Sequence, residues 1–199
     1  RGARVQTRVW KVHCQALDQG DYISDWLTPA LESHEALRLV RMNPEFTRPQ
    51  NKPEIMGEHT TVDFADAAPF LVANQASLDR LNAELSSKSM RTVPFDQFRP
   101  NIVVQGLEPF AEHDLGGLSM SDYQFKFRTP CERCIVTTIN QKNAGKDPFG
   151  EPFKTLRAIN PMPGNPRAPA FGQYATLVGD EPRVIRVGDQ FEPIAVSAI

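Results

Sequence analysis

Cysteine is scarce in this sequence. Only Cys14, Cys131 and Cys134 occur among its 199 residues. Three cysteines are too few for a disulfide-stabilised scaffold, for a four-cysteine zinc site or for a typical iron–sulfur cluster. We therefore expect a reducing compartment, the cytoplasm of a bacterial type of cell, in which the close pair Cys131 and Cys134 binds a metal or does redox chemistry.

Long apolar runs and an excess of one charge are also missing. No stretch approaches the roughly 18 apolar residues that cross a bilayer, so we expect no membrane span. The net charge of −2 and a pI near 6.1 argue against nucleic acid as a partner. Dinucleotide, P-loop and nucleophile-elbow motifs are absent, and we expect neither a flavin nor an iron–sulfur cluster in this chain.

Histidine is sparse as well, since only four occur and they are scattered singly. We expect none of them to be a metal ligand. The acidic residues around His113 (Glu108, Glu112 and Asp114) are typical of a solvated turn. The absence of Met and of an apolar signal region at the start of the sequence leads us to expect a fragment or a processed chain.

The elements that are present predict a mainly β fold, because 17 prolines and 12 glycines interrupt the chain throughout. Alternation of apolar and polar residues in Tyr123–Phe127 indicates a half-buried strand. Short β-rich runs predict further strands at Ile102–Val104, Ile135–Ile139 and Val184–Val187. A Gly188-Asp189 turn is expected after the last of them. Residues 141–150 are predicted as an exposed loop, and 161–169 as a second irregular segment.

Two helices are expected. Residues 74–88 place Leu78, Leu81 and Leu85 on one face, with Asn74 or Ser77 as the N-cap. Residues 21–31 carry a second apolar face that includes Trp26, and Pro29 limits their length. Trp10 and Trp26 are interpreted as packing residues. The predicted architecture is a β-barrel with a few peripheral helices, as one domain over residues 41–199 preceded by an N-terminal flank over residues 1–40.

The stretch Pro130-Cys131-Glu132-Arg133-Cys134 is the most informative for chemistry. It precedes a β-rich run, so Arg133, not a helix N-terminus, would have to stabilise a thiolate here. A thiolate is a soft ligand that suits a transition metal, whereas zinc would need a second cysteine pair or a histidine cluster. On spacing alone, two buried and unreactive thiols explain the pair equally well.

A second stretch, Phe98-Arg99-Pro100-Asn101, combines an extended turn with two polar side chains. Arg99 offers a planar fork of donors for phosphate, and Asn101 offers a donor and an acceptor for the edge of a heterocycle. Taken alone, the stretch is better explained by a surface ion pair at Arg99 and a turn closed by Asn101.

Together these stretches resemble MOSC-domain proteins, in particular the mitochondrial amidoxime reducing component and its bacterial relatives. The matching pieces occur in the family's order from Asp66 to Asp189. They are Asp66–Leu71, Ala76–Asn82, Phe98–Val104, Cys131–Thr138, Glu151–Leu156, Phe171–Tyr174 and Val187–Asp189. A looser match precedes them at Val9–Lys11 and Ser24–Leu27.

The resemblance implies a MOSC-type β-barrel that binds the molybdenum cofactor, a phosphate-bearing molybdopterin. It implies that Cys134 supplies the protein thiolate to molybdenum and is the catalytic residue. It further implies cofactor contacts from Asp66, Arg99, Asn101, Glu132 and Arg133. This chain departs from the family at Glu132, where a small polar residue is usual, and at Ala68, where a serine is usual.

The activity that the resemblance implies is the two-electron reduction of small N-hydroxylated compounds such as amidoximes and hydroxylamines. A separate electron-donor protein, ferredoxin-like or cytochrome-type, would supply the electrons. The alternative is a non-catalytic MOSC module that carries the cofactor or its sulfur. The family's N-terminal β-rich segment, which supplies a Lys, a Ser and an Arg to the cofactor phosphate, is not found here, so we expect weaker cofactor retention.

Overall fold

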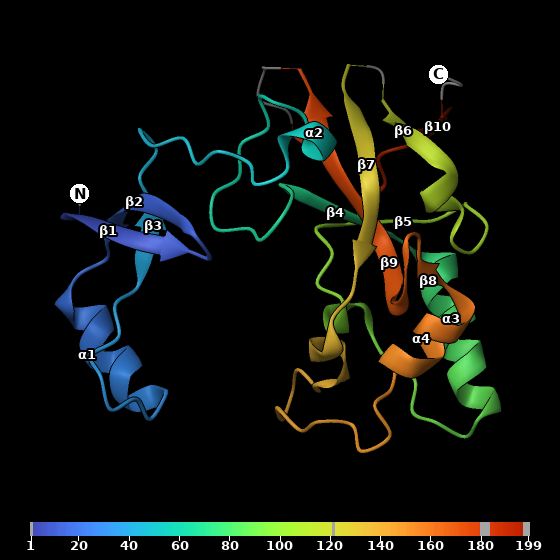
Figure 1. Cartoon of the computed structure of the whole chain (residues 1–199), viewed down its shortest axis with the longest axis horizontal. Coiled ribbons are helices and arrows are strands. Elements are labelled where there is room, and N and C mark those ends of the chain that lie inside the picture. Colours follow the sequence, from blue (N-terminus) through green and yellow to red (C-terminus); the bar gives the residue numbers. More distant parts are fainter. Residues whose placement is uncertain (1, 121, 180–183, 197–199) are drawn as a thin grey trace. The chain divides into compact units, whose positions relative to one another are not determined.

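The chain folds into two compact units. The computed structural model describes residues 2–120, 122–179 and 184–196 (Figure 1). The first unit comprises the residues up to Pro53 together with Gly57–Ala67, and the second comprises Glu54–Met56 together with the residues from Ala68 onward. The proposed start of a domain at residue 41 stays a prediction.

The first unit is a small antiparallel sheet with one helix. Strands β1 (Arg4–Val9), β2 (Val12–Asp18) and β3 (Val40–Met42) pair in the order β1-β2-β3. The tight turn between β1 and β2 places Trp10 at φ 53° and leaves its side chain 70% exposed. The interpretation of Trp10 as a packing residue was therefore wrong, because a side chain at the tip of a two-residue hairpin turn projects away from the sheet.

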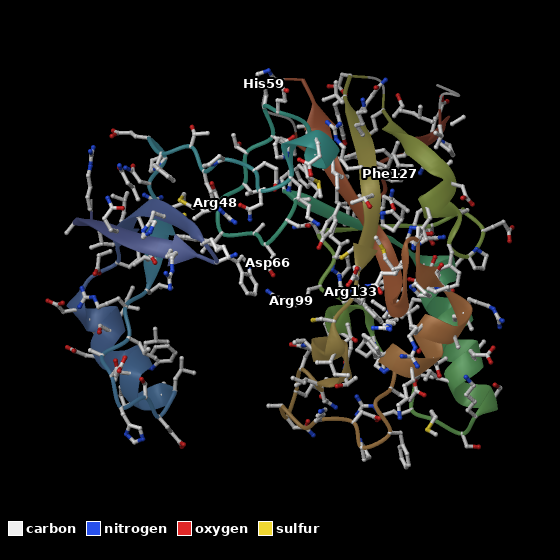
Figure 2. All side chains as sticks on the ribbon, in the orientation of Figure 1. Arg48, His59, Asp66, Arg99, Phe127 and Arg133 are labelled. Atoms are coloured by element: carbon white, nitrogen blue, oxygen red, sulfur yellow. The ribbon has the colours of Figure 1, made fainter. Side chains whose placement is uncertain are left out.

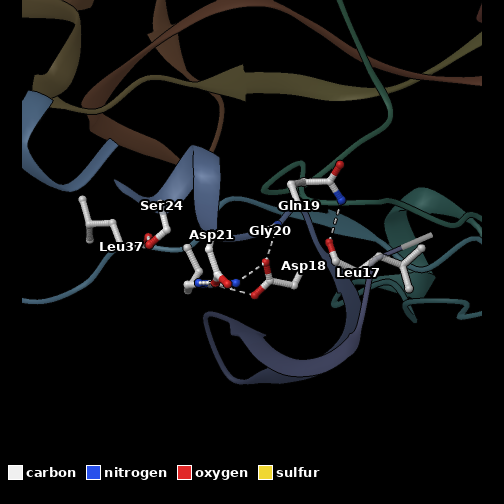
Figure 3. Close-up of polar contacts among 8 residues, drawn as sticks. Leu17, Asp18, Gln19, Gly20, Asp21, Ser24 and Leu37 are labelled. Carbon is white, nitrogen blue, oxygen red and sulfur yellow. Dashed lines mark hydrogen bonds and ion pairs between the residues drawn. The ribbon is translucent and has the colours of Figure 1, made fainter. Parts of the chain in front are cut away.

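Helix α1 (Asp21–Ala30) confirms the predicted helix, and Pro29 lies in its last turn. Its apolar face is not buried, however, since Trp26 is 66% exposed. The buried residue of this helix is Ser24, whose hydroxyl donates to the carbonyl of Leu37 at 2.6 Å (Figure 3). This hydrogen bond ties the helix to the loop that follows it, while Ile23 and Leu27 of the apolar face are only half-buried.

A charged cluster joins the end of β2 to the start of α1. The carboxylate of Asp18 accepts from Gly20 N–H at 2.7 Å, and from Arg38 Nε at 2.8 Å and Nη2 at 2.7 Å (Figure 3). Arg38 Nη1 also donates to Asp21 at 2.6 Å. The hydrogen bonds that Asp18 accepts lower its pKa below the ordinary value. The bond from the Arg38 side chain contributes most, and the bond from Gly20 N–H contributes next.

The second unit is a curled sheet with helices beside it. Its strands are β4 (Phe70–Asn74), β5 (Ile102–Val104), β6 (Leu115–Ser119), β7 (Gln124–Glu132), β8 (Pro161–Met162), β9 (Asn165–Val178) and β10 (Glu192–Ala195). They pair in the order β10-β6-β7-β9-β4-β5, with β8 on β9, and only the β4–β5 pair is parallel. This mainly β architecture confirms the predicted fold class.

Two helices cover part of this sheet. Helix α3 (Gln75–Ser87) is capped by the Asn74 side chain, as predicted, and buries Leu78, Leu81 and Leu85. Helix α4 (Phe153–Ile159), which the sequence analysis missed, buries Leu156 in the same apolar cluster. A shorter helix, α2 (Pro53–Met56), and three 3₁₀ turns complete the set: η1 (Phe95–Gln97), η2 (Ala111–Asp114) and η3 (Ile135–Thr138).

Four further predictions had different outcomes. The β5 strand and the 141–150 loop are confirmed. Residues 161–169, predicted as irregular, form the β8–β9 hairpin, whose turn is enabled by Gly164 at φ 77°. The predicted strand at Val184–Val187 was wrong, because these residues pair with no strand in the part of the chain that the structure describes. They lead into a turn closed by Asp189 N–H on the Arg186 carbonyl at 3.1 Å.

Glu112 in η2 is fully buried, so the prediction of a solvated turn was wrong at this residue. Its carboxylate accepts from the Ser77 hydroxyl at 2.9 Å and from Asn74 Nδ2 at 3.2 Å. These bonds satisfy a buried carboxyl that would otherwise be costly, and they fasten η2 to the start of α3.

Among the described residues, no helix has the length and apolar character to cross a membrane.

Candidate functional site

The stretch around Cys134 begins at the end of β7, which runs through Cys131 to Glu132. Cys131 is 2% exposed, whereas Cys134 is exposed. Both are free thiols. The sequence pair is thus divided by the fold into one buried and one accessible cysteine.

Residues after Cys134 do not form the predicted strand, and that prediction was wrong. They form the 3₁₀ turn η3, with Cys134 as its N-cap. Thr137 donates to the Cys134 carbonyl from its N–H at 3.2 Å and from its hydroxyl at 3.0 Å, and Thr138 Oγ1 donates to the Ile135 carbonyl at 2.7 Å. These local bonds compete with a sheet ladder and override the β propensity of the run.

Arg133 is held in place on three sides. Its Nη1 donates to Cys131 Sγ at 2.9 Å, and its Nη2 donates to the Phe98 carbonyl at 2.8 Å. The guanidinium carbon lies 5.8 Å from the centre of the Phe98 ring, within the range of a cation–π contact. The Nε of Arg133 is buried and has no partner among the described residues.

The second predicted stretch follows η1. Phe98 is fully buried and stacks on Phe171 with ring centres 4.0 Å apart. Arg99 then turns into the left-handed region at φ 56°, a strained backbone for a residue with a side chain. Its side chain is exposed and makes no ion pair within the described ranges, which leaves the guanidinium free for a ligand and contradicts the surface ion pair considered for this stretch alone (Figure 2).

Asn101 holds the start of β5 beside β4. Its side-chain oxygen accepts from Leu71 N–H at 2.7 Å, and its own N–H donates to the Leu71 carbonyl at 2.9 Å. The amide Nδ2 remains as the donor that these bonds do not use.

Gln97 joins the two stretches, and the sequence analysis did not single it out. Its buried Nε2 donates to the Thr137 carbonyl at 2.8 Å and to the Ile139 carbonyl at 2.9 Å. Together with the bond from Arg133 to Phe98, it fixes the Arg99 segment against the Cys134 segment. The only signal in the sequence was its position next to Phe98.

The two other predicted residues, Glu132 and Asp66, form hydrogen bonds with residues outside this group. Glu132 is exposed, and its Oε1 accepts from Asn165 Nδ2 at 3.2 Å. Asp66 belongs to the first unit, where its Oδ1 accepts from Trp10 Nε1 at 3.0 Å (Figure 2). The structure therefore brings together Arg99, Asn101, Arg133 and Cys134 in the second unit and describes Asp66 separately.

This group suits an anionic ligand that brings its own metal. It offers an accessible thiol at Cys134, an unpaired cation at Arg99 and an orphaned donor at Arg133 Nε. No three His, Cys, Asp or Glu side chains gather as a metal site in the part of the chain that the structure describes. A metal bound by Cys134 would therefore have to bring its remaining ligands with its cofactor.

Comparison with known proteins agrees with this reading. The MOSC domain family matches residues 59–192. The chain is 33% identical to mitochondrial amidoxime-reducing component 1 of Danio rerio over 178 residues. This match covers 87% of the chain and 53% of the Danio rerio protein. It is 32% identical to the same component of Homo sapiens over 189 residues, a match that covers 92% of this chain and 54% of the human protein.

A third relative has a different name. The chain is 32% identical over 182 residues to the molybdenum cofactor sulfurase of Drosophila grimshawi, with 92% of this chain and 21% of that protein covered. The chain spans about half the length of the amidoxime-reducing components it matches. On the extent of the family match and on these identities, the chain belongs to the MOSC domain family.

Proposed function

We propose that the chain binds the molybdenum cofactor and, when supplied with electrons, reduces small N-hydroxylated compounds such as amidoximes and hydroxylamines. The observation that carries the proposal is the accessible thiol of Cys134. It follows Arg133 in the chain, and hydrogen bonds from Gln97 and Arg133 hold the Arg133 segment rigidly against the segment that carries Arg99. The names of the amidoxime-reducing relatives support the substrate class.

The chain's own residues have distinct tasks in this proposal. Cys134 would donate its thiolate as the protein ligand of the metal. Arg99 would pair with the negative charge of the pterin phosphate or dithiolene, and Asn101 Nδ2 and Arg133 Nε would donate to its polar edge. When bound, the cofactor supplies the two-electron chemistry that removes an oxygen from the substrate.

Rigidity in this group favours such a role. Gln97 and Arg133 fix the two segments before any ligand arrives, so binding need not order them. The positive φ of Arg99 is consistent with this interpretation, because strained residues persist where surrounding contacts hold them, often at functional sites. Asp66 and Glu132 remain proposed contacts that rest on the family match alone.

Electrons would come from a separate donor protein, ferredoxin-like or cytochrome-type. We place the chain in a reducing compartment of cytoplasmic type, and its three free thiols suit that environment.

One test is to load the purified chain with the cofactor, to measure bound molybdenum, and to follow reduction of benzamidoxime with a chemical electron donor. Bound metal near one per chain with turnover supports the proposal. A persulfide on a cysteine of the purified chain without bound metal would favour a second function as a non-catalytic sulfur or cofactor carrier. The similarity to a molybdenum cofactor sulfurase makes that alternative specific.

A further inference from the structure

A groove of about 610 Å³ lies along strands β6, β7, β9 and β10 of the second unit. These strands are neighbours in the sheet (Figure 1). Phe125 on β7 is fully buried, whereas Gln124 and Lys126 on either side of it are exposed. The alternation of the strand therefore gives this face polar side chains, and both Gln124 and Lys126 line the groove.

The charge of the groove has one sign. Lys126 and Arg128 both line it, and no Asp or Glu is among the described residues that line it. Arg128 follows Phe127 at a shift in the β7–β9 register, where the strand bulges. Alternation over two positions places Arg128 on the same face as Lys126, and both side chains line the groove across this bulge.

Arg128 is a cation in need of a partner. Its Nε donates to the hydroxyl of Thr176 on β9 at 2.8 Å, which fixes the guanidinium over the sheet. The side chain is half-buried and forms no ion pair with any described residue. Burial lowers the pKa of Arg128, with no compensating contribution from a carboxylate. An anion in the groove would offset this desolvation.

His113 forms a fixed part of the wall. Its Nδ1 lies 3.0 Å from Gln173 Oε1, and its Nε2 lies 3.0 Å from Asn160 Nδ2. The same Asn160 nitrogen also donates to the Ala170 carbonyl at 2.9 Å, which identifies it as the amide donor. Both ring nitrogens are thus engaged by neighbouring amides, which leaves Lys126 and Arg128 as the basic side chains that face a ligand in the groove.

The rest of the wall is largely apolar. It includes Leu115, Phe127, Val178, Ile194 and Val196. A bare inorganic anion would leave this surface without contact, whereas a ligand with an apolar body would cover it. The volume lies within the range of small-molecule sites, which is roughly 300–1,000 Å³.

We propose that this groove binds a small organic anion, with one carboxylate or phosphate head against Arg128 and Lys126 and an apolar body along Ile194 and Val178. None of its lining residues is among the proposed cofactor contacts. The site is thus independent of the proposed reductase function, and it would supply a second binding event on the same unit.

Titration calorimetry of the full chain with octanoate tests the proposal. We expect one octanoate per chain with a submillimolar Kd, and amide NMR shifts centred on Lys126 and Thr176. Arg128→Gln should weaken binding about tenfold or more, as expected for the loss of one charged hydrogen-bond partner. Arg157→Gln, the same change at an exposed arginine outside the groove, should leave binding unchanged.

Two further probes test the two halves of the ligand. Octyl phosphate should bind like octanoate, whereas 1-octanol and inorganic phosphate should each bind at least tenfold more weakly. Equal binding of 1-octanol or of inorganic phosphate would overturn the proposal, and so would equal losses in the Arg128 and Arg157 variants. If Arg128→Gln does not fold, Lys126→Glu at an exposed position should still abolish octanoate binding. Cys134→Ser should bind octanoate normally, which separates this result from any failure of the cofactor proposal.

Discussion

The guanidinium of Arg133 donates a hydrogen bond to the sulfur of Cys131 across 2.9 Å. The cation of the cysteine stretch is thus committed to the buried thiol, while the accessible thiol of Cys134 stands outside this bond. The two cysteines therefore differ in more than exposure: one fixes an arginine, and the other is available to a ligand.

Substituting the two cysteines should separate these roles. Cys134→Ser should remove bound molybdenum, because a hydroxyl is a poor substitute for a thiolate on a soft metal. Cys131→Ser should keep most of it, because a hydroxyl can still accept from Arg133. Metal analysis after loading measures both. Equal loss in the two variants would point to a paired role and contradict the assignment to Cys134.

Arg99 should matter for ligand binding and little for folding. Arg99→Ala should weaken cofactor binding while the melting temperature of the cofactor-free chain changes by no more than about 2 °C, because an exposed side chain without an ion pair contributes little to stability. Arg99→Gly should melt slightly higher than Arg99→Ala, since glycine adopts a positive φ without strain. Calorimetric melting is the measurement, with exposed Arg91→Ala as the control. A large drop in the cofactor-free chain would make Arg99 a structural residue.

Gln97 should matter both for ligand binding and for folding stability. Gln97→Ala leaves the Thr137 and Ile139 carbonyls without their donor, which should cost about 1–3 kcal/mol of unfolding free energy and reduce the molybdenum retained. Urea unfolding and metal analysis would measure the two effects. Gln141→Ala, at an exposed position, serves as the matched control. Unchanged metal content together with the loss of stability would restrict Gln97 to a purely structural part.

The first unit should lose stability in acid through Asp18. Because Arg38 and Gly20 lower the folded pKa of Asp18, its contribution is fully present above the unfolded pKa, about 3.9, and disappears as the pH falls through the lowered folded value. Asp18→Asn should therefore be less stable at pH 7 and lose less stability between pH 4 and pH 2. Both tryptophans lie in this unit, so urea unfolding followed by tryptophan fluorescence reports on it. The exposed Asp25→Asn should behave like the unaltered chain, and the idea fails if the two variants match.

Electron supply should be external. The sequence carries no dinucleotide motif, so the cofactor-loaded chain should not reduce benzamidoxime with NADH alone, and an added reductase system should restore turnover. Steady NADH oxidation by the chain alone would contradict this expectation.

Sequence reasoning succeeded where local pattern and tertiary packing agree. The leucine spacing of α3 and the Phe125–Phe127 alternation each match the buried face of their own element, so periodicity located both, and the Asn74 cap marked where α3 begins. It failed at Ile135–Thr138, where threonine hydroxyls bond to carbonyls three residues back and replace a strand with a 3₁₀ turn.

The candidate site was predictable only in part, for a similar reason. The family match pointed to Arg99 and Cys134, but no pattern in the sequence links Gln97 to a carbonyl forty residues away. Contacts of that length depend on how the strands between them fold, as does the contrast between Cys131 and Cys134. Trp26 shows the reverse case, in which an apolar helical face is left exposed.

Because the three cysteines are unequally buried, alkylation of the chain can distinguish the accessible cysteine from the two enclosed ones. In the native state only Cys134 is open to a water-soluble alkylating reagent, whereas Cys14 and Cys131 are enclosed. Mass spectrometry should therefore find a single fast adduct per native chain and three after denaturation. A ligand coordinated by Cys134 would suppress that adduct, so one alkylation time course can follow occupancy of the site and integrity of the fold together.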